Sequence, residues 1–309
     1  MNLIADIGAT NARCALLDET GRIVRTETCL NTHFDSLESL LRRFAAGATL
    51  ERGVLAVAAP ISGDEITMTN VEWRFGQKAL AESLGLASLR IVNDFEALAH
   101  ALPRLTAENC HRIGRGESDP RATRAVLGAG SGLGVAAAVP DGAGWTAVAG
   151  EGGHVTLPTL SEAEAWLIAD HGDANGHCSA ERLLSGPGLV RIHSSLARRA
   201  GVAVDAITAA EITRGALAGE AIAKQTYDAF FALLGTVAGN LALTVGARGG
   251  VYIAGGVAPR VVGLLERSAF RERFIAKGRY RAYLDAIPTL VITAERPAFV
   301  GLKALLGFD

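Results

Sequence analysis

The first residues of the chain form short apolar runs that are interrupted by single polar residues. The segments LIADIG and ARCALLD, then RIVRTET after a turn at residues 19–21, predict three consecutive strands within residues 3–28. The first two strands are joined through DIGATN at residues 6–11, which is rich in small residues. We therefore expect a β-meander with an open first loop.

The apolar residues between positions 37 and 44 recur at helical spacing. Asp35 and Glu38 are expected to frame a capping box ahead of this helix, and Gly47 is expected to end it. Further along, the pattern predicts strands at 53–60 and 89–94 and helices at 76–84 and 95–102. Alternating strands and helices are typical of an α/β domain, in which ligands bind at the carboxyl ends of strands.

The periodic pattern is lost around residues 105–124, which indicates a crossover into a second domain that begins near Arg124. The opening of that domain is similar to the start of the chain, because residues 125–148 align with residues 3–24. Gly130 then falls on Gly8, and Gly132 on Thr10. Two related halves are one interpretation, and chance similarity between two glycine-rich hairpins is the other.

The remaining sequence is mainly helical in pattern. Ser161 and Glu164 are expected to cap one helix, Glu181 begins another, and SGPG at 185–188 is expected to break it. Long helices are predicted within 209–243, followed by a buried strand at 249–259 that runs into a Gly-Gly turn. The uncharged stretch 229–247 is nearly long enough to span a membrane, but its glycine, threonine and asparagine residues favour a close-packed helix and a turn inside a core.

Composition limits the class of protein. A chain of 309 residues, 49% of them hydrophobic, favours two globular domains. The net charge of −2 lacks the basic excess that nucleic-acid binding requires. The four cysteines show no paired spacing, and no signal peptide is visible, so we expect a reduced, cytoplasmic protein without disulfides, nucleic acid or membrane as partners.

Two glycine-rich loops are candidates for binding phosphate. DIGATN at 6–11 places a carboxylate before small residues, so that backbone amides can approach an anion, and GAGSGLG at 128–134 repeats the arrangement without the acid. A simple hairpin turn is the alternative for each. No helix follows GAGSGLG, and neither loop contains Gly-Lys-Ser or Gly-Lys-Thr, which excludes the dinucleotide-binding and Walker patterns.

Polar residues at other turns are candidates for catalysis and for sugar recognition. Asp94, after Asn93 at a strand end, could accept a hydroxyl proton during phosphoryl transfer, although an Asx turn that caps the next helix is the alternative. Glu151 and His154 in EGGH could hydrogen-bond a polyol, or belong to a solvated loop. Glu181 lies in the first turn of a helix, where interaction with the helix dipole is the alternative.

The segment HGDANGHCSAE at 171–181 contains two histidines, an aspartate and a cysteine. Their spacing does not match a zinc site on a helix or in a knuckle, so we interpret the segment as a polar loop that precedes a helix.

Seven motifs in order along the chain resemble those of the bacterial glucokinases, a group of the actin-like ATPase and hexokinase superfamily. The motifs are DIGATN, TMTNVEW (67–73), IVNDF (91–95), GAGSGLG, GEGGHV (150–155), SAERLLSGPGL (179–189) and GGVYIAGG (249–256). The resemblance implies an α/β fold of two actin-like, ribonuclease H-like domains around a central cleft. The small domain would comprise residues 1–104 and the C-terminal segment 295–309, and the large domain residues 105–294.

The resemblance also implies an activity: transfer of phosphate from ATP to the 6-hydroxyl of glucose, which gives glucose 6-phosphate and ADP in the first step of glycolysis. Asp94 would be the catalytic base. The implied sugar-binding residues are Asn93, Asp94, Glu151, His154 and Glu181. The implied nucleotide-binding residues are Asp6, Gly8, Ala9, Thr10, Asn11, Gly130, Ser131, Gly132, Gly255 and Gly256, with Asp6 holding Mg²⁺ through water.

Two departures from related families qualify this expectation. Related repressors and kinases carry a zinc-binding cysteine run before the sugar-contacting glutamate, whereas only Cys178 stands here, so we expect no zinc. Ala9 replaces a second glycine of the first loop, which restricts the approach of the amides slightly. Dimers are common in similar families, and we expect a homodimer.

Three other functions remain as alternatives. A kinase for another hexose or an amino sugar would carry the same motifs. A sugar-sensing repressor would need a DNA-binding helix-turn-helix ahead of the first loop, and Asp6 stands too close to residue 1 for one. An actin-like chaperone or filament ATPase would have no sugar for the motifs around Asn93, Glu151 and Glu181 to bind.

Overall fold

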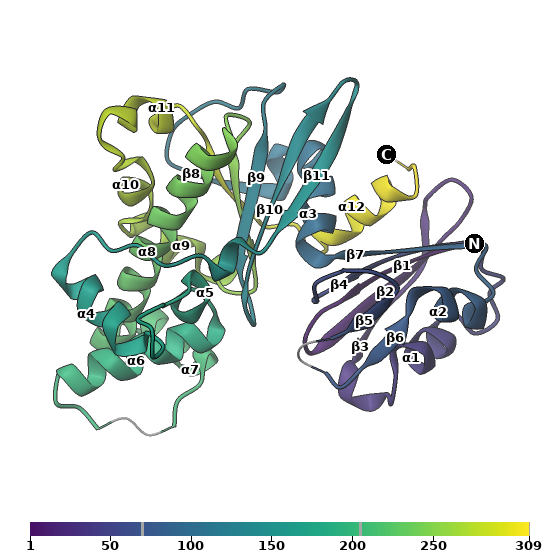
Figure 1. The fold of residues 1–309 in the computed structure, drawn as a ribbon, viewed down its shortest axis with the longest axis horizontal. Coiled ribbons are helices and arrows are strands. Elements are labelled where there is room, and N and C mark those ends of the chain that lie inside the picture. Colours follow the sequence, from purple (N-terminus) through teal and green to yellow (C-terminus); the bar gives the residue numbers. More distant parts are fainter. Residues whose placement is uncertain (69–70, 204–205, 309) are drawn as a thin grey trace. The chain divides into compact units, whose positions relative to one another are not determined.

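The computed structural model describes residues 1–68, 71–203 and 206–308, so Thr69 and Asn70 of the TMTNVEW motif lie outside the described residues. The chain divides into two compact units (Figure 1). Unit 1 comprises Met1–Leu105, Trp145–Ala149 and Ala294–Asp309, and unit 2 comprises Thr106–Gly144 and Gly150–Thr293.

A five-stranded sheet of order β3-β2-β1-β4-β7 forms the centre of unit 1. Its strands are β1 (Asn2–Ile7), β2 (Asn11–Leu17), β3 (Ile23–Leu30), β4 (Arg52–Val57) and β7 (Ser88–Asn93). The first three strands form the predicted antiparallel meander, whereas β1, β4 and β7 are parallel. A separate two-stranded sheet pairs β5 (Glu65–Thr67) with β6 (Arg74–Gly76).

Helices cover both faces of this sheet because its strands alternate apolar side chains between the faces. In β1, Leu3 and Ile7 belong to the core beneath α1 (Leu37–Phe44) and α2 (Gln77–Leu84). Ile4 belongs to the core of the opposite face, where α3 (Asp94–Ala101) packs with α12 (Pro297–Leu305) near the C-terminus. A Cβ atom on Gly301 would lie only 1.8 Å from the backbone oxygen of Ala97, so α12 and α3 are in close contact.

A six-stranded sheet of order β11-β10-β9-β12-β13-β8 forms the core of unit 2, and residues 145–149 of its outermost strand β11 are grouped with unit 1. Its strands are β8 (Cys110–Ile113), β9 (Arg124–Ala129), β10 (Leu133–Asp141), β11 (Gly144–Gly150), β12 (Val251–Gly255) and β13 (Thr289–Ile292). The strands β9, β12 and β13 are parallel, and β9 pairs with β10 in an antiparallel hairpin. This order repeats that of unit 1 with β8 added, so the two glycine-rich hairpins occupy equivalent positions in two similar sheets.

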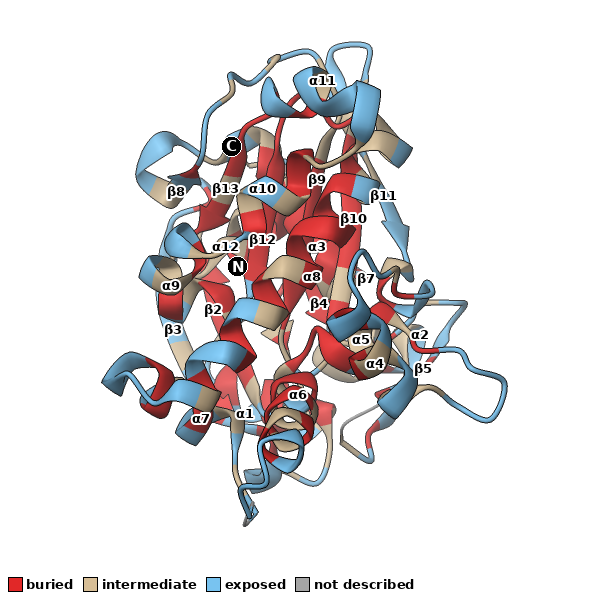
Figure 2. Ribbon diagram, turned by 90° about the vertical axis from the view of Figure 1, so that its left-hand side faces the viewer, coloured by how far each residue is buried: buried red, intermediate tan, exposed pale blue. Residues whose placement is uncertain are grey.

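The helices of unit 2 are α4 (Glu162–His171), α5 (Ala180–Leu183), α6 (Gly186–Arg199), α7 (Ala209–Ala218), α8 (Ala221–Val245), α9 (Val262–Arg267), α10 (Phe270–Ile275) and α11 (Arg281–Asp285). By length and composition alone, α8 could cross a membrane. However, 56% of its most apolar window is buried (buried residues are red in Figure 2). Phe230, Phe231 and Leu234 belong to the core of unit 2. In this structure α8 is therefore a core helix of unit 2.

Short 3₁₀ helices complete the structure: η1 (Asn31–His33), η2 (Leu102–Arg104), η3 (Ala107–Asn109), η4 (Gly152–His154), η5 (Ala258–Val261) and η6 (Gly278–Tyr280). Most predicted elements are present, with ends that differ by a few residues. The strand predicted at 53–60, for example, is β4 and ends at Val57.

One local prediction was wrong, and two were incomplete. The capping box of α1 is formed by Ser36 and Ser39, whose side chains bond each other's backbone N–H, rather than by Asp35 and Glu38. The predicted crossover contains the edge strand β8, whose partner β13 is remote in sequence. The SGPG segment starts a helix as well as ending one, because Ser185 caps α6 and accepts from the backbone N–H of Gly188.

The box predicted at Ser161 and Glu164 forms only in part. Ser161 accepts from the backbone N–H of Glu164, while the Glu164 carboxylate binds the backbone N–H of Leu160 and the guanidinium of Arg273. The Glu164 carboxylate therefore binds α10, through Arg273, as well as the residue that precedes the N-cap.

Candidate functional site

One edge of the sheet in unit 1 holds several predicted site residues. Ile7 pairs with Val57, and Val57 pairs with Asn93, so that the carboxyl ends of β1, β4 and β7 are in register. The DIGATN loop leaves this edge from β1, and Asp94 follows it from β7. Parallel strands in register thus bring the first glycine-rich loop and the Asn-Asp pair to the same edge of one sheet.

Asp6 lies on β1, one residue before this edge. Its side chain is 20% exposed and contacts the Arg13 guanidinium at 3.4 Å across the β1–β2 hairpin. Burial raises the pKa of Asp6, and Arg13 opposes this effect only in part. A partly buried carboxyl group with a raised pKa beside a glycine-rich loop is a typical feature of a functional site.

Asn93 and Asp94 also form the predicted cap of a helix. The Asn93 side chain accepts from the backbone N–H of Phe95 at 2.9 Å and donates to the Ala59 oxygen at 3.2 Å. Asp94 is the first residue of α3, and its Oδ1 accepts from the same N–H of Phe95 at 3.0 Å. Both side chains are half-buried. These contacts fix the two side chains at the end of β7 and are compatible with a further role there.

The second glycine-rich loop and the Gly-Gly turn share an edge of the sheet in unit 2. Ala129 at the end of β9 pairs with Gly255 at the end of β12. Gly255 has a φ of 83°, and a Cβ atom there would lie 2.3 Å from the Ala129 oxygen, so only glycine fits without strain. Gly256 is exposed and faces open space, as does Gly130 of the neighbouring loop.

The loop at 130–132 is held by hydrogen bonds from two sides. The backbone N–H of Gly186, at the start of α6, donates to the Gly130 oxygen at 2.8 Å. On the other side, the Glu181 carboxylate accepts from the backbone N–H of Leu133 at 2.9 Å. A Cβ atom on Gly132 would lie 2.3 Å from Glu181 Oε2, so the carboxylate lies directly against the loop.

A short antiparallel pairing brings the motifs of His154 and Glu181 together. Thr156 pairs with Ser179, and the flanking backbone bonds run from Leu157 to Cys178 and from Ala180 to Val155. His154 therefore stands two residues before one side of the bridge, and Glu181 two residues after the other. The loop that carries His154 also packs on β10, because a Cβ atom on Gly153 would lie 2.0 Å from the Leu133 oxygen.

Glu151 and His154 present their side chains to solvent. Their exposed fractions are 63% and 60%, and Glu151 Oε2 lies 3.9 Å from His154 Nε2. Glu181, in contrast, is half-buried. The three residues therefore offer two accessible polar groups and one anchored carboxylate on connected segments of unit 2.

The polar segment at 171–181 behaves as a folded loop. Asp173 accepts from the backbone N–H groups of Asn175 and His177, and His177 Nδ1 lies 3.0 Å from the Thr156 hydroxyl oxygen. Cys178 is buried. Among the described residues, no three His, Cys, Asp or Glu side chains form a group that could hold a metal ion.

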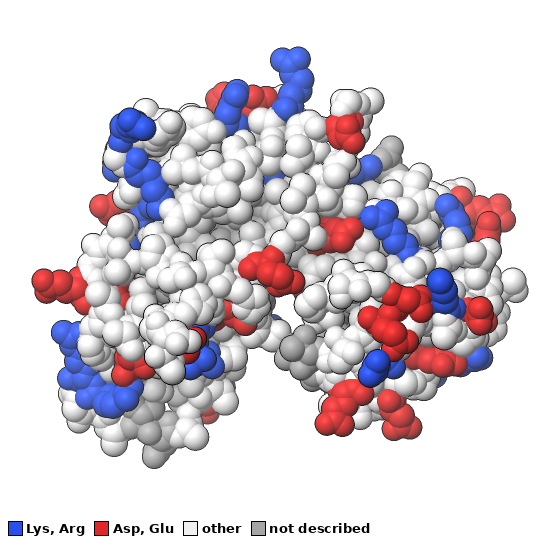
Figure 3. All heavy atoms as spheres, in the orientation of Figure 1, with Lys and Arg blue, Asp and Glu red and all other residues white. Residues whose placement is uncertain are grey.

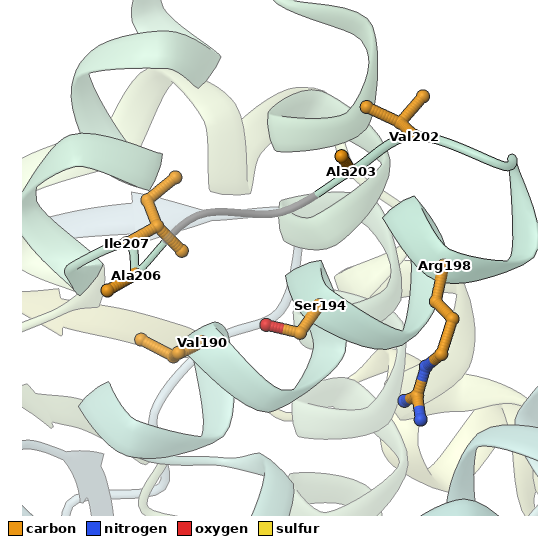
Figure 4. A pocket seen from close by; sticks show the side chains of 7 residues that line it. All are labelled: Val190, Ser194, Arg198, Val202, Ala203, Ala206 and Ile207. Atoms are coloured by element: carbon orange, nitrogen blue, oxygen red, sulfur yellow. The ribbon is translucent and has the colours of Figure 1, made fainter.

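A surface cavity of about 630 Å³ lies elsewhere in unit 2 (Figure 4). Residues of α6, including Ser194 and Arg198, line it together with Val202, Ala203 and Ile207. None of the predicted sugar or nucleotide residues lines this cavity, and it supplies no acid or nucleophile next to a glycine-rich loop. We therefore place the candidate site at the two sheet edges.

Charges are mixed over the face drawn in Figure 3, where basic and acidic side chains lie among neutral ones. Several of the arginines are paired, such as Arg42 with Glu38, Arg74 with Glu65 and Arg248 with Asp119. This distribution, with the net charge of −2, differs from the basic surface typical of nucleic-acid binding.

Sequence patterns did not identify the groups that contact Asp6 and Glu181. Arg13, which contacts Asp6, and the N–H of Leu133, which binds Glu181, act through contacts that only the folded chain brings about. Asp6 and Arg13 are cross-strand partners in the hairpin register, so a correct register for 2–7 against 11–17 would have found that pair.

Two similar halves, each with a glycine-rich hairpin at the centre of its sheet, define a two-domain, actin-like fold of the kind found in sugar kinases. A solved structure of a glucokinase from an Antarctic psychrotroph matches this chain with a TM-score of 0.84 and 32% identity, over 99% of this chain and 98% of that one.

The family follows from the comparison of whole sequences. The glucokinase family model matches residues 3–307. A glucokinase of Chromobacterium violaceum is 43% identical, over 99% of this chain and 89% of its own length, and one of Paramagnetospirillum magneticum is 42% identical, over 99% and 97%. The chain belongs to the glucokinase family, which confirms the resemblance seen in its motifs.

Proposed function

We propose that this protein transfers the γ-phosphoryl group of ATP to the 6-hydroxyl of glucose and releases glucose 6-phosphate and ADP, the first step of glycolysis. The observation that carries the proposal is membership of the glucokinase family over residues 3–307, with the motifs at both sheet edges present. Such a reaction needs an aligned hydroxyl, a proton acceptor and donors for the charge on the phosphates.

Asp94 is the proton acceptor in this proposal. It stands at the carboxyl end of β7 and at the same sheet edge as the first glycine-rich loop. As the first residue of α3 it also lies at the positive end of a helix dipole, which favours the ionised carboxylate that a base requires. Asn93 beside it would bind the sugar through its amide.

Glu151, His154 and Glu181 bind the remaining sugar hydroxyls in this proposal. Carboxylates accept, and an imidazole both donates and accepts, so the three can satisfy adjacent hydroxyls of a polyol. The exposure of Glu151 and His154 supports their access to a ligand. The bond between Glu181 and Leu133 holds that carboxylate beside the loop assigned to phosphate.

The two glycine-rich loops bind the phosphates of ATP, and the Gly-Gly turn lies against its adenosine. The first group comprises Gly8, Ala9, Thr10 and Asn11, the second Gly130, Ser131 and Gly132, and the turn Gly255 and Gly256. Backbone N–H groups in such loops bind anions without a lysine. The open space beside Gly130 and Gly256 supports close approach of a ligand.

Asp6 is the residue that fits Mg²⁺. Magnesium in kinases is typically held by one or two carboxylates together with phosphates and water, so a single aspartate beside the first loop suffices. Asp6 is partly buried, and its contact with Arg13 is long at 3.4 Å, so its carboxylate can still interact with a nearby cation. Bound magnesium would neutralise charge on the phosphates while Asp6 positions it through water.

A coupled kinase assay tests the proposal. The purified protein is incubated with Mg²⁺ and glucose, mannose, fructose, glucosamine or N-acetylglucosamine, each with ATP, ADP or polyphosphate as donor. We expect the highest kcat/KM with glucose and ATP, and no measurable ATP hydrolysis without sugar. Preference for another sugar would favour the alternative of a different hexose or amino sugar kinase, and sugar-independent hydrolysis would favour an actin-like ATPase.

We further propose a cytoplasmic homodimer without bound zinc. The motifs place the chain with enzymes of sugar metabolism, and dimers are common in similar families. Sedimentation of the purified protein tests the dimer, and elemental analysis tests the metal. Stoichiometric zinc would contradict our interpretation of His177 and Cys178.

A further inference from the structure

Asn31 is a buried polar residue that the assignments above do not use. It follows directly after β3, is the first residue of η1, and is only 1% exposed. The β2–β3 register pairs Asn11 with Leu30, which places Asn31 beside the first glycine-rich loop.

Asn31 binds two backbone carbonyls of that loop. Its side-chain Nδ2 donates to the Gly8 oxygen at 2.9 Å, and its backbone N–H donates to the Thr10 oxygen at 2.9 Å. Within the loop, the N–H of Gly8 donates to the Asn11 oxygen at 3.0 Å. Two of the loop's peptide groups are therefore fixed by one residue from outside the loop.

Fixing these carbonyls sets the direction of the N–H groups that follow them. In a planar trans peptide the N–H points opposite to the C=O. Because the carbonyls of Gly8 and Thr10 face Asn31, the N–H groups of Ala9 and Asn11 face away from it. Carbonyl oxygens repel an anion, so this arrangement turns the attractive groups of the loop toward a phosphate and the repulsive groups toward the protein.

The side-chain oxygen of Asn31, Oδ1, indicates that this residue does not serve stability alone. Its Oδ1 is buried and has no hydrogen-bond partner among the residues that the structure describes. An unpaired buried acceptor destabilises a fold, so an asparagine here is a poor choice for stability alone. The Nδ2 group of the amide, in contrast, donates a hydrogen bond to the loop.

We infer that Asn31 is a positioning residue that orients the first glycine-rich loop for the phosphates of the nucleotide. This inference rests on the proposed function, in which that loop binds ATP. It concerns a residue that acts through Gly8 and Thr10 and does not itself touch the substrate.

The test compares Asn31→Ala, which removes the donor, with Asn31→Asp, which keeps the shape but replaces the donor by an acceptor. Thr32→Ala, at an exposed position of the same 3₁₀ turn, is the matched control. For each protein, KM for ATP and glucose, kcat, the Kd for the non-hydrolysable analogue AMPPNP and the midpoint of thermal unfolding are measured.

We expect both Asn31 variants to raise KM for ATP and the Kd for AMPPNP about tenfold, as for loss of one well-placed hydrogen bond, and to lower kcat. We expect KM for glucose to change less than twofold and thermal stability to stay close to that of the control. A wild-type Kd for AMPPNP in both variants would overturn the inference, as would equal losses in both substrates with a lowered unfolding midpoint, or failure of both variants to fold.

The binding measurement separates this inference from the proposed function. If the wild-type protein binds AMPPNP but phosphorylates no sugar, the proposed function fails, and the Asn31 variants still test the loop. If the wild type phosphorylates glucose and the variants bind AMPPNP equally well, only the inference about Asn31 fails.

Discussion

The Glu181 carboxylate accepts a hydrogen bond from the backbone N–H of Leu133 at 2.9 Å. Glu181 belongs to the group that we assign to the sugar, whereas Leu133 directly follows the loop that we assign to phosphate. A Cβ atom on Gly132 would lie 2.3 Å from the same carboxylate, so the two elements are in direct contact. Within unit 2, therefore, one side chain is shared between sugar recognition and the shape of a glycine-rich loop.

This shared role predicts different kinetic effects for three variants. Glu181→Ala releases the N–H of Leu133 and should raise KM for both glucose and ATP. Glu181→Gln keeps an acceptor for that N–H but loses the charge, so it should raise KM for glucose roughly tenfold with little change for ATP. His154→Ala should raise KM for glucose and leave KM for ATP unchanged. It should also reduce the preference for glucose over 2-deoxyglucose.

Steady-state kinetics with each substrate varied in turn measures these effects. In the wild type, kcat/KM should be lower for 2-deoxyglucose than for glucose by the equivalent of about 1 to 3 kcal/mol. This is the cost of leaving a polar group of the site without its hydrogen-bond partner. If the variants lose ATP binding and keep wild-type KM for glucose, we have assigned the sugar and nucleotide residues the wrong way round.

Two adjacent glycines should respond differently to a methyl group. Gly256 faces open space, so Gly256→Ala should fold normally but raise KM for ATP if adenosine lies against this turn. Gly255 has a φ of 83° and no room beside Ala129, so Gly255→Ala should lower the thermal unfolding midpoint as well. A Gly256→Ala protein with wild-type KM for ATP would remove this turn from the nucleotide site.

The buried ion pair of Arg273 and Glu164 should contribute strongly to stability. The guanidinium binds both carboxylate oxygens at 2.6 and 2.9 Å, and Glu164 is 7% exposed. Arg273→Met removes the guanidinium from that buried carboxylate, which keeps the hydrogen bond from the backbone N–H of Leu160, and should destabilise unit 2 by about 3 to 5 kcal/mol. Thermal and urea unfolding measure this effect.

The exposed pair of Arg42 and Glu38 provides the control for this measurement. Its N–O distance of 2.8 Å is similar, but both side chains are about half-exposed. Arg42→Met should therefore leave the unfolding midpoint almost unchanged. Equal effects of Arg273→Met and Arg42→Met would show that burial does not decide the strength of these pairs.

The sequence predicted most of the fold because its patterns are local. The three strands within 3–28, the alternation around 53–102 and the strand at 249–259 each follow from apolar spacing and glycine positions. The edge strand β8 could not be found in this way, because Cys110–Ile113 is short and pairs with β13, far along the chain. The capping box was misplaced because Ser36 and Ser39 carry the same kind of signal as Asp35 and Glu38.

The candidate site was predictable only as separate motifs. That Asn93 and the DIGATN loop share a sheet edge follows from the parallel register of β1, β4 and β7, which no local pattern contains. Asn31 gave no signal in the sequence, since its bond to Gly8 spans 23 residues and its burial depends on the sheet. The roles of the site residues remain predictions for the experiments described above.

His100 should make the protein less stable in mild acid. Burial, with the nearby Arg90 and Arg104, lowers the pKa of His100 to about 4. An unfolded histidine takes up a proton near pH 6.5, so protons favour the unfolded chain as the pH falls from about 6.5 toward 4. This effect of His100 is absent above pH 6.5.

Unfolding by urea between pH 7 and pH 4.5 measures this dependence. His171 and His193 also have lowered pKa values because of burial, so each contributes in the same direction. His100→Gln should reduce the loss of stability on acidification relative to the wild type. An unchanged pH profile in this variant would mean that His100 takes up its proton equally well in the folded state.

The most direct test of the account is the turnover of Asp94→Asn together with its affinity for glucose. An amide keeps the shape of the carboxylate but cannot accept the hydroxyl proton, so kcat should fall by about 10² to 10⁴ while the Kd for glucose changes little. Glu96→Gln is the matched control, since Glu96 lies on the same helix and pairs with Arg90 at 3.2 Å. We predict near-wild-type turnover for Glu96→Gln and the large loss for Asp94→Asn; a folded Asp94→Asn protein with wild-type kcat would contradict the assignment of Asp94 as the base.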